Sequence, residues 1–181
     1  MDGNKLIATN GRYVFTSSDG GLNWAVSDGC CSSGYYSVGS SYDGNKLVVT
    51  EVSGPINSSI DGGGTWTQKY PRREWTSVAS SADGTKLVAS VYGEQIYTSI
   101  DGGNTWIASG PSRKWNSVAI SADGTKLAAS VSTGQIYTYS FGSTVGATGS
   151  ISGGQNGSIE LQYQGNGQFG VLSHEGSLTA Q

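Results

Sequence analysis

Apolar and polar positions alternate along this chain in short runs rather than in long periodic stretches. Runs rich in Val, Ile, Ala, Trp and Tyr are separated by clusters of Gly, Asp, Asn and Ser. β-Branched and aromatic residues bounded by such turn residues are typical of β-strands. In the best-preserved stretch the pattern predicts strands at 75–81, 86–92, 95–100 and 105–109. No segment has the apolar spacing of an amphipathic helix, so the pattern predicts an all-β protein.

The four-strand unit recurs along the chain. A turn of the form Asp-Gly-Asn/Thr-Lys-Leu begins at Asp2, Asp43, Asp83 and Asp123, so that successive copies are 41, 40 and 40 residues apart. Repeats of about 40–50 residues with four short strands each are typical of β-propeller blades. The sequence therefore predicts a β-propeller of four-stranded blades. The predicted repeat units are approximately 1–34, 35–74, 75–114, 115–157 and a degenerate unit at 158–181.

The first and last units depart from this pattern. The first unit begins at its second strand, 5–10, and lacks the strand that would precede it. A Gly/Ser/Thr-rich stretch at 142–158 has the composition of a linker. Segments 158–163, 169–173 and 177–180 then resemble the first three strands of a divergent unit. We predict a single domain, 1–181, of about four and a half units.

With about four and a half units, the edge strands of the terminal sheets can find partners in three ways. The chain forms a five-bladed ring with three-stranded terminal blades, it is part of a larger propeller, or it pairs its open edges with a neighbouring copy. The five-bladed ring is the arrangement that we favour.

One motif occurs in three of the units, at residues 17–24, 59–66 and 99–106, with the pattern Ser-x-Asp-Gly-Gly-x-Thr/Asn-Trp. The Asp side chain accepts hydrogen bonds from backbone N–H groups of its own turn. The two glycines adopt backbone angles that other residues resist, and the Trp leaves the turn to bury a large ring. The motif thus predicts a tight hairpin turn that is anchored to a core.

The motif resembles the Asp-box, also called the BNR repeat, of sialidases and many other β-propellers. The resemblance covers residues 2 to about 140, and the fourth unit departs from it because Phe141 stands where the Asp is expected. It implies a propeller fold more strongly than it implies any activity. It also implies that the Asp and Trp residues of the boxes are structural. These residues are Asp19, Trp24, Asp61, Trp66, Asp101 and Trp106.

Composition excludes several classes of protein. Only 13% of the 181 residues are charged, and the net charge is −3, which argues against a nucleic-acid-binding protein. The sequence has no apolar run long enough for a membrane-spanning helix. Its two cysteines, Cys30 and Cys31, are adjacent, so they form a strained disulfide with each other, link two chains, or remain free thiols. No signal peptide is visible after Met1, so a secreted form would carry its leader outside this sequence.

Candidate ligand-binding residues lie in the loops that differ most between units. In a propeller with its first strand innermost, these loops share the face opposite the Asp-boxes. An exposed ring there stacks on the apolar face of a sugar, and Arg forms paired hydrogen bonds with a carboxylate. The candidate residues are Arg72, Arg73, Trp75, Tyr92, Glu94, Arg113, Lys114 and Trp115. The alternative is that the two Trp residues, at one repeat position, belong to the core and that the basic residues are a solvated rim.

The residues of a catalytic sialidase cannot be assembled from this sequence. The family's activity requires three arginines for the substrate carboxylate, a Tyr/Glu nucleophile pair and an acid Asp. The chain has four arginines, Arg12, Arg72, Arg73 and Arg113, and a single histidine, His174, without triad or metal-ligand spacing. We therefore expect no catalytic residues, no metal site and no cofactor.

The expected function is that of a non-enzymatic, extracellular or cell-surface binding module that recognises carbohydrate. A second hypothesis is a structural protein that assembles into oligomers or filaments by strand addition between open terminal blades. A third is a fragment of a larger sialidase-like glycosidase. A glycan or another copy of the chain is the expected partner, and no nucleic-acid or membrane partner is expected.

Overall fold

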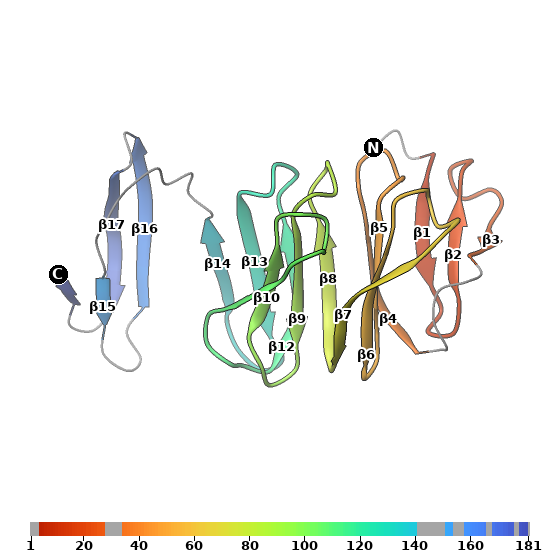
Figure 1. The fold of residues 1–181 in the computed structure, drawn as a ribbon. Helices are drawn as coiled ribbons and strands as arrows, with labels where there is room; N and C mark the ends of the chain where they lie inside the picture. Colours follow the sequence, from red (N-terminus) through yellow and green to blue (C-terminus); the bar gives the residue numbers. More distant parts are fainter. Residues whose placement is uncertain are drawn as a thin grey trace. The chain divides into compact units, whose positions relative to one another are not determined.

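The computed structural model describes residues 4–27 and 34–140, and the strand backbones at 151–153, 158–165, 168–175 and 178–180. The chain forms two compact units, Met1–Phe141 and Gly142–Gln181, where the sequence predicts a single domain (Figure 1). The regular elements in the described ranges are all β-strands, which confirms the all-β class. Within those ranges no helix is long and apolar enough to cross a membrane.

The first unit consists of four antiparallel sheets, each built from strands that follow one another in the chain. Sheet 1 contains β1 (Leu6–Thr9), β2 (Val14–Ser17) and β3 (Ala25–Val26). Sheet 2 contains β4 (Tyr35–Ser40), β5 (Leu47–Glu51), β6 (Gly54–Ser59) and β7 (Thr67–Arg73). Sheet 3 contains β8 (Trp75–Ser80), β9 (Leu87–Val91), β10 (Ile96–Ser99) and β11 (Ile107–Ser109). Sheet 4 contains β12 (Trp115–Ile120), β13 (Lys126–Val131) and β14 (Ile136–Ser140).

Sheet 3 confirms the strand pattern read from residues 75–109. Each observed strand ends within two residues of its predicted limits. Sheet 1 confirms that the first unit begins at its second strand, because β1 occupies the position that β9 occupies in sheet 3. The 40-residue spacing of the turns therefore reports the sheet boundaries correctly.

The four sheets lie side by side, and the hydrophobic core lies between them (Figure 1). The first strands of the sheets form one row, with β8 in contact with β4 on one side and β12 on the other. The second strands β5 and β9 are buried along their whole length, because other sheets cover both of their faces. Their apolar residues accordingly come in a continuous run, Leu47–Val49 in β5 and Leu87–Ala89 in β9, rather than alternating with polar ones.

The largest core cluster lies between sheets 2 and 3 and is rich in aromatic rings. Trp75, Tyr97 and Trp106 are buried in it, and Tyr70 of β7 packs against them. The ring centroid of Tyr70 lies 6.0 Å from that of Trp75, 5.7 Å from that of Tyr97 and 6.1 Å from that of Trp106. The Tyr70–Trp75 pair is edge-to-face and the other two are tilted, and an edge-to-face pair contributes roughly 0.5–1.5 kcal/mol beyond the burial of its area.

The second unit differs from the predicted fifth blade. Strands β16 (Ser158–Gly165), β17 (Gln168–Glu175) and β18 (Leu178–Ala180) lie close to the expected positions, but β18 does not pair with β17. It pairs instead with β15 (Ile151–Gly153), which lies in the stretch that reads as a linker. The β16–β17 hairpin brings residues 158 and 175 opposite each other, so the segments that flank it meet and pair. Composition alone missed β15, because backbone pairing does not require an apolar pattern.

Candidate functional site

Each Asp-box forms a closed set of hydrogen bonds within its own turn. In the third box, Asp101 Oδ1 accepts from the Ser99 hydroxyl at 2.8 Å and from the Thr105 backbone N–H at 2.9 Å. Asp101 Oδ2 accepts from the Thr105 hydroxyl at 2.6 Å, and Ser99 Oγ accepts from the Gly103 N–H at 2.9 Å. The boxes around Asp19 and Asp61 repeat this arrangement. The carboxylates are thus engaged in shaping the turn.

These bonds hold the box carboxylates in their charged form. Hydrogen bonds from the hydroxyl and then the backbone N–H of Thr105 lower the pKa of Asp101 to about 2, and the backbone N–H of Thr65 has the leading effect in lowering the pKa of Asp61 to about 2. Donation to a carboxylate favours its ionised state, so protonation of the Asp would weaken the turn. A structural role for the Asp residues follows from this geometry.

The repeat turns that begin at Asp43, Asp83 and Asp123 lie between the first and second strands of sheets 2, 3 and 4, and their Asp side chains form a second set of hydrogen-bonded turns that the sequence pattern located but did not explain. In sheet 3, Asp83 accepts from the Ser81 hydroxyl at 2.6 Å and from the Thr85 hydroxyl at 2.6 Å. The Ser81 hydroxyl has the leading effect in lowering the Asp83 pKa below its ordinary value. The Ser two residues before each Asp was the available signal, because it also precedes the Asp of every Asp-box.

The three box tryptophans differ in their burial. Trp106 is only 8% exposed, whereas Trp24 is 43% exposed. Trp66 is intermediate and donates from Nε1 to the Ser27 hydroxyl of the preceding unit at 2.9 Å. The prediction that each Trp buries its ring is therefore wrong for Trp24. Trp66 and Trp106 contact the preceding unit through Ser27 and Tyr70, whereas no sheet precedes sheet 1 in the described part of the chain to cover Trp24.

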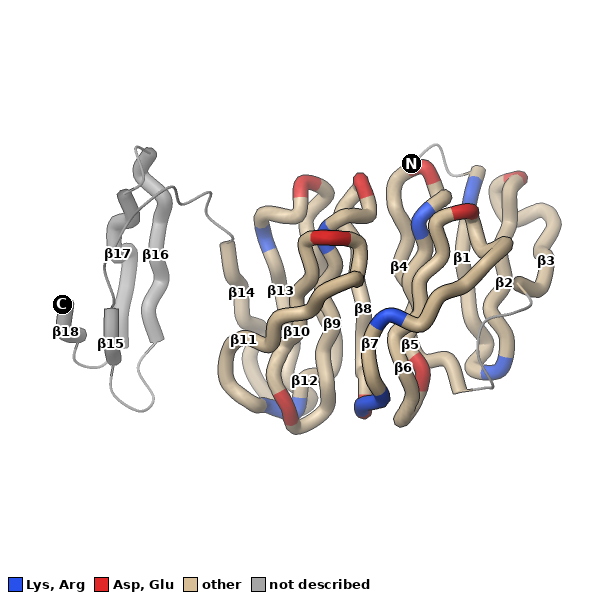
Figure 2. The backbone as a smooth tube through the Cα atoms, viewed as in Figure 1, with Lys and Arg blue, Asp and Glu red and all other residues tan. Residues whose placement is uncertain are grey.

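The two ends of the sheets carry different turns, as the sequence predicts. At one end the Asp-box turn lies beside the first turn of the same sheet, with Gly102 N–H donating to the Thr85 carbonyl at 2.8 Å. At the other end Gly93 N–H donates to the Arg113 carbonyl at 3.0 Å, which joins the loop between β9 and β10 to the loop before β12. Figure 2 shows acidic residues at the upper ends of the sheets and both basic and acidic residues at the lower ends, where these loops lie. We call the latter the loop face.

Arg73 on the loop face is engaged with two residues of the next sheet. Its Nη1 lies 2.7 Å from Glu94 Oε2, and the Tyr97 hydroxyl donates to the same oxygen at 3.0 Å. The guanidinium also lies over the Tyr97 ring, 5.0 Å from its centroid. Burial and then the bond to Glu94 raise the pKa of the Tyr97 hydroxyl. Arg73 and Glu94 therefore link sheets 2 and 3, a role that the sequence analysis did not assign.

Arg113 repeats only part of this arrangement. Its guanidinium lies over the ring of Tyr137, 4.6 Å from the centroid, as Arg73 lies over Tyr97. The position equivalent to Glu94, 40 residues later, is Gly134. Arg113 is consequently exposed and keeps its hydrogen-bonding groups accessible.

The candidate tryptophans Trp75 and Trp115 are core residues, which corrects their proposed role in ligand binding. Each is only 2% exposed. Trp75 Nε1 donates to the Gly54 carbonyl at 3.0 Å, whereas Trp115 Nε1 is buried with no partner in the described residues. Trp75 and Trp115 are the first residues of β8 and β12, and both rings are covered because neighbouring strands pack over this end of each sheet. The structure thus agrees with the core alternative for this repeat position.

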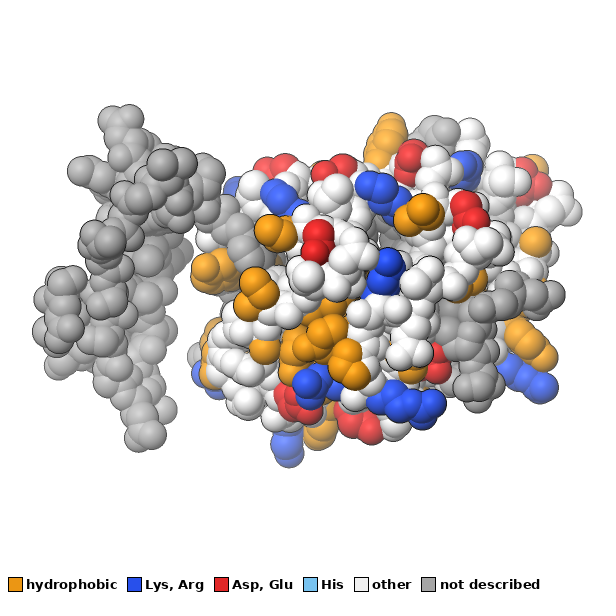
Figure 3. All heavy atoms as spheres, viewed as in Figure 1, with side chains coloured by type: hydrophobic (Ala, Val, Ile, Leu, Met, Phe, Trp, Pro, Cys, Tyr) orange, Lys and Arg blue, Asp and Glu red, His pale blue; other side chains and the backbone are white. Residues whose placement is uncertain are grey.

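One aromatic ring among the candidate residues remains half-exposed on the loop face. Tyr92 is 50% exposed, and its N–H donates to the Glu74 carbonyl at 2.9 Å. Tyr92 also forms an isolated β-bridge with Lys114, which is exposed. Arg72 is exposed on β7. Figure 3 shows basic, acidic and hydrophobic side chains together along the lower edge of the first unit.

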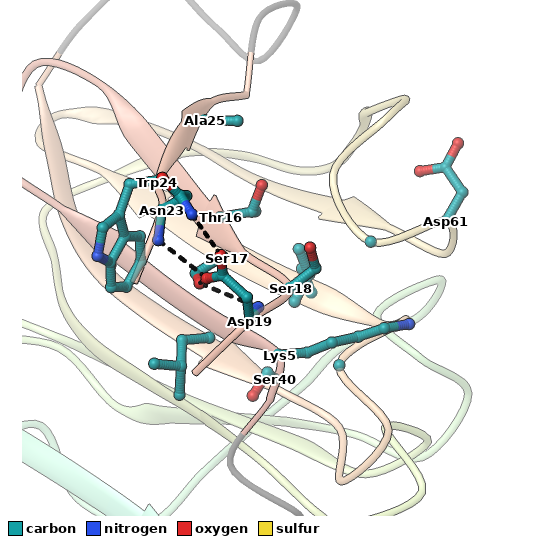
Figure 4. Close-up of a pocket in the computed structure, with 14 residues that line it drawn as sticks. Lys5, Thr16, Ser17, Ser18, Asp19, Asn23, Trp24, Ala25, Ser40 and Asp61 are labelled. Carbon is teal, nitrogen blue, oxygen red and sulfur yellow. Dashed lines mark hydrogen bonds between the residues drawn. The ribbon is translucent and has the colours of Figure 1, made fainter. Parts of the chain in front are cut away.

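A hollow of about 370 Å³ lies at the opposite end, between sheets 1 and 2 (Figure 4). Lys5, Asp19, Asn23, Trp24 and Asp61 are among the residues that line it. Figure 4 shows that Asp19 is engaged with Ser17 and Asn23 of its own turn. Because its polar groups shape the Asp-box, we do not place the ligand site here.

Three further expectations bear on chemistry. Cys30 and Cys31 lie outside the described residues, and the side chain of His174 also does. Among the side chains that the structure describes, no group of three His, Cys, Asp or Glu residues is arranged to hold a metal ion.

Comparison with known proteins identifies the fold. No protein-family model matches the sequence, and no curated protein matches it. Among solved structures, an ancestral GH74 enzyme matches with a TM-score of 0.60 and 16% identity over 75% of this chain. The structure described as YCF48 bound to D1 peptide matches with a TM-score of 0.58 and 19% identity over 77% of this chain. The computationally designed Ika4 protein matches with a TM-score of 0.60 and 11% identity over 77% of this chain.

The matches differ in how much of the other protein they cover. The matched region covers 21% of the GH74 enzyme, 48% of YCF48 and 86% of Ika4. At these identities the similarity concerns the fold alone. The chain has a β-propeller fold, and its four antiparallel sheets of three or four strands correspond to propeller blades.

Proposed function

We propose that this protein is a non-enzymatic binding module that recognises carbohydrate on its loop face, as Asp-box (BNR) propellers of the extracellular space do. The observation that carries the proposal is the half-exposed ring of Tyr92 among charged side chains. Lys114, which forms a β-bridge with Tyr92, and Arg113, whose carbonyl accepts from the Gly93 N–H, supply exposed hydrogen-bond donors in the adjacent loop, and Arg72 is a further exposed donor on this face. A flat ring for the apolar face of a sugar and donors for its hydroxyl or carboxylate groups are the two requirements of sugar recognition.

The non-enzymatic part of the proposal is supported by Arg73. Its guanidinium is held by Glu94 and Tyr97, so it is not available to bind a substrate carboxylate. The alternative is a fragment of a larger glycosidase, since two of the matched structures are GH74 enzymes of which this chain covers 21% each.

A glycan array followed by calorimetry on the full chain tests the proposal. We expect one class of glycan to bind, and Tyr92→Ala and Arg113→Ala to weaken binding at least about tenfold, as loss of an interface hot spot does. Tyr42→Ala is the matched control, because Tyr42 is 58% exposed in a turn at the opposite end of the sheets. Absence of any glycan ligand, or equal effects of Tyr92→Ala and Tyr42→Ala, would overturn the proposal. Hydrolysis of a bound glycan would favour the glycosidase alternative.

A further inference from the structure

One carboxylate of the loop face is bound by two side chains of the protein itself. Glu94 Oε2 lies 2.7 Å from Arg73 Nη1 and accepts from the Tyr97 hydroxyl at 3.0 Å. The turn that carries Glu94 is closed by a backbone hydrogen bond from the Glu94 N–H to the Val91 carbonyl, at 3.3 Å. A guanidinium and a tyrosine hydroxyl thus form a complete binding arrangement for a carboxylate between sheets 2 and 3.

The next repeat keeps this arrangement but lacks its carboxylate. The residues 40 positions after the three members of the arrangement are Arg113, Gly134 and Tyr137. The Arg113 guanidinium lies 4.6 Å from the centroid of the Tyr137 ring, as the Arg73 guanidinium lies 5.0 Å from that of Tyr97. The cation and the ring are therefore placed alike in both repeats, and only the acidic side chain is missing.

The backbone at Gly134 has the same turn as in sheet 3, because the Gly134 N–H donates to the Val131 carbonyl at 3.3 Å. The donors that would hold a carboxylate there are not engaged by another one. Arg113 is exposed and forms no ion pair with any described residue. The Tyr137 hydroxyl has only a long hydrogen bond, 3.4 Å, to Gln135 Oε1.

The position of the missing carboxylate is accessible from the loop face. Arg113 and Gly134 are both exposed. Lys114 is also exposed and adds a second positive charge, and its carbonyl accepts from the Ser132 N–H at 2.9 Å, which joins its loop to the turn of sheet 4. Strand β14 runs away from the loop face, so the chain leaves sheet 4 at the opposite end (Figure 1).

We propose that Arg113 and the Tyr137 hydroxyl bind an anionic group of the ligand, in the position that the Glu94 carboxylate occupies in the preceding repeat. A carboxylate or a sulfate offers the charged oxygen acceptors that these donors match, and such charge-assisted hydrogen bonds are about twice as strong as neutral ones. Tyr92 lies in the adjoining loop, where the Gly93 N–H donates to the Arg113 carbonyl at 3.0 Å. A ligand that uses both is an acidic sugar, and this part of the inference rests on the proposed carbohydrate binding.

Inorganic sulfate, added to the full chain and followed by NMR, tests the anion site without any glycan. We expect saturable shifts of the Arg113 Nε–H and Gly134 N–H signals. A Cβ atom at Gly134 would meet only contacts of 3.4 Å or more, so Gly134→Glu can supply the missing carboxylate. It should weaken sulfate binding at least about tenfold. Gly134→Gln has the same length without the charge, and as the matched control it should change binding by less than about threefold.

Three further variants test the donors. Tyr137→Phe keeps the ring but removes the hydroxyl, and it should weaken sulfate binding by about tenfold. Arg113→Ala should abolish binding. Arg12→Ala removes the same charge from another exposed Arg that lies over a tyrosine ring, 5.2 Å from the centroid of Tyr13, and it should leave binding unchanged. Far-UV circular dichroism and the thermal midpoint verify that all variants fold.

These measurements either support the anion site or overturn it. Sulfate binding that Gly134→Glu removes and Gly134→Gln retains supports the proposal. The proposal fails if sulfate does not shift the Arg113 signals. It also fails if Arg12→Ala weakens binding as much as Arg113→Ala does, because binding would then follow the overall charge of the loop face.

The glycan array separates this inference from the proposed function. We expect the bound glycans to be acidic and to lose their binding to Gly134→Glu. Neutral glycans that bind the unsubstituted chain and Gly134→Glu equally would overturn this inference and leave the proposed function intact. Site-specific sulfate binding without any glycan ligand would support the anion site and overturn the proposed function.

Discussion

The tryptophans of the first and third Asp-boxes allow the contribution of packing between sheets to the free energy of unfolding to be measured with one pair of substitutions. Trp24 and Trp106 occupy the same position in their boxes. Each donates its indole N–H to the carbonyl of a glycine of its own turn, Trp24 to Gly21 at 3.1 Å and Trp106 to Gly103 at 2.9 Å. Their local contacts are therefore matched. Only Trp106 also packs on the preceding sheet, which leaves it 8% exposed against 43% for Trp24.

The difference in exposure converts to an expected difference in stability. An indole side chain buries up to about 250 Å², so the extra burial of Trp106 amounts to roughly 90 Å². At about 25 cal/mol per Å² this corresponds to about 2 kcal/mol. Replacing a fully buried Trp by Ala typically costs about 3–5 kcal/mol. We therefore expect Trp106→Ala to lower the free energy of unfolding by about 4 kcal/mol, and Trp24→Ala to lower it by about 2 kcal/mol.

Urea denaturation followed by far-UV circular dichroism measures both values, because this signal comes mainly from the backbone and remains when one indole is removed. Leu22→Ala is the control for a box substitution without packing, since Leu22 is 84% exposed. It should change stability by less than about 0.5 kcal/mol. Equal losses for Trp24→Ala and Trp106→Ala would refute the reasoning, because they would show that the local turn, and not the contact between sheets, determines the contribution of the ring.

Three further predictions follow from the turns and the loop face. Asp61 and Asp101 have a pKa of about 2 in the folded chain, below the value of about 3.9 expected when unfolded, so their stabilisation is present above pH 4 and is lost as the pH falls toward 2. Between pH 4 and pH 2, the thermal midpoint of the double variant Asp61→Asn, Asp101→Asn should therefore fall less than that of the unsubstituted chain. Calorimetry measures both midpoints, and an equal fall would contradict the stabilising role of the two ionised carboxylates. A Cβ atom at Gly54 would lie 2.4 Å from Glu51 Cβ, whereas a Cβ atom at the equivalent Gly134 would meet its nearest atom at 3.4 Å, an ordinary contact. In urea denaturation, Gly54→Ala should therefore lower the free energy of unfolding by about 2–3 kcal/mol, and Gly134→Ala should lower it by less than about 0.5 kcal/mol. The Arg73–Glu94 pair is partly exposed, with side-chain exposures of 30% and 44%. A double-mutant cycle with Ala should therefore give an interaction free energy below about 1 kcal/mol for the pair. A much larger value would mean that the pair is desolvated.

Several features of the fold could be predicted because they depend on residues that are close in sequence. The Asp-box turn at 99–106 forms from hydrogen bonds between residues at most four apart, so the motif reports it directly. The limits of β8 to β11 follow from short apolar runs and the turns between them. The pairing of β15 with β18 could not be predicted in this way, because its register depends on a hairpin that lies between the two strands.

The candidate site was less accessible to sequence reasoning. Tyr92, Arg113 and Lys114 lie exposed on the expected face, as the loop assignment requires. The engagement of Arg73 with Glu94 was missed, although both residues were named, because their contact joins two sheets. The signal was the Tyr at position 97, which recurs as Tyr137 beneath Arg113.

The sequence by itself determined the class of element, the number of strands in sheets 1, 2 and 3 and the face on which each turn lies, whereas sheet 4 has three described strands where four were predicted. These properties depend on spacing and turn chemistry within about 40 residues. The tertiary structure alone decided which equivalent residues are buried. Trp24 and Trp106 have the same motif, and Ile136 and Ile96 have the same place in a strand, yet in each pair one is exposed and the other covered. The reason is physical: an apolar side chain at a given repeat position is buried only when a neighbouring sheet supplies the opposing surface.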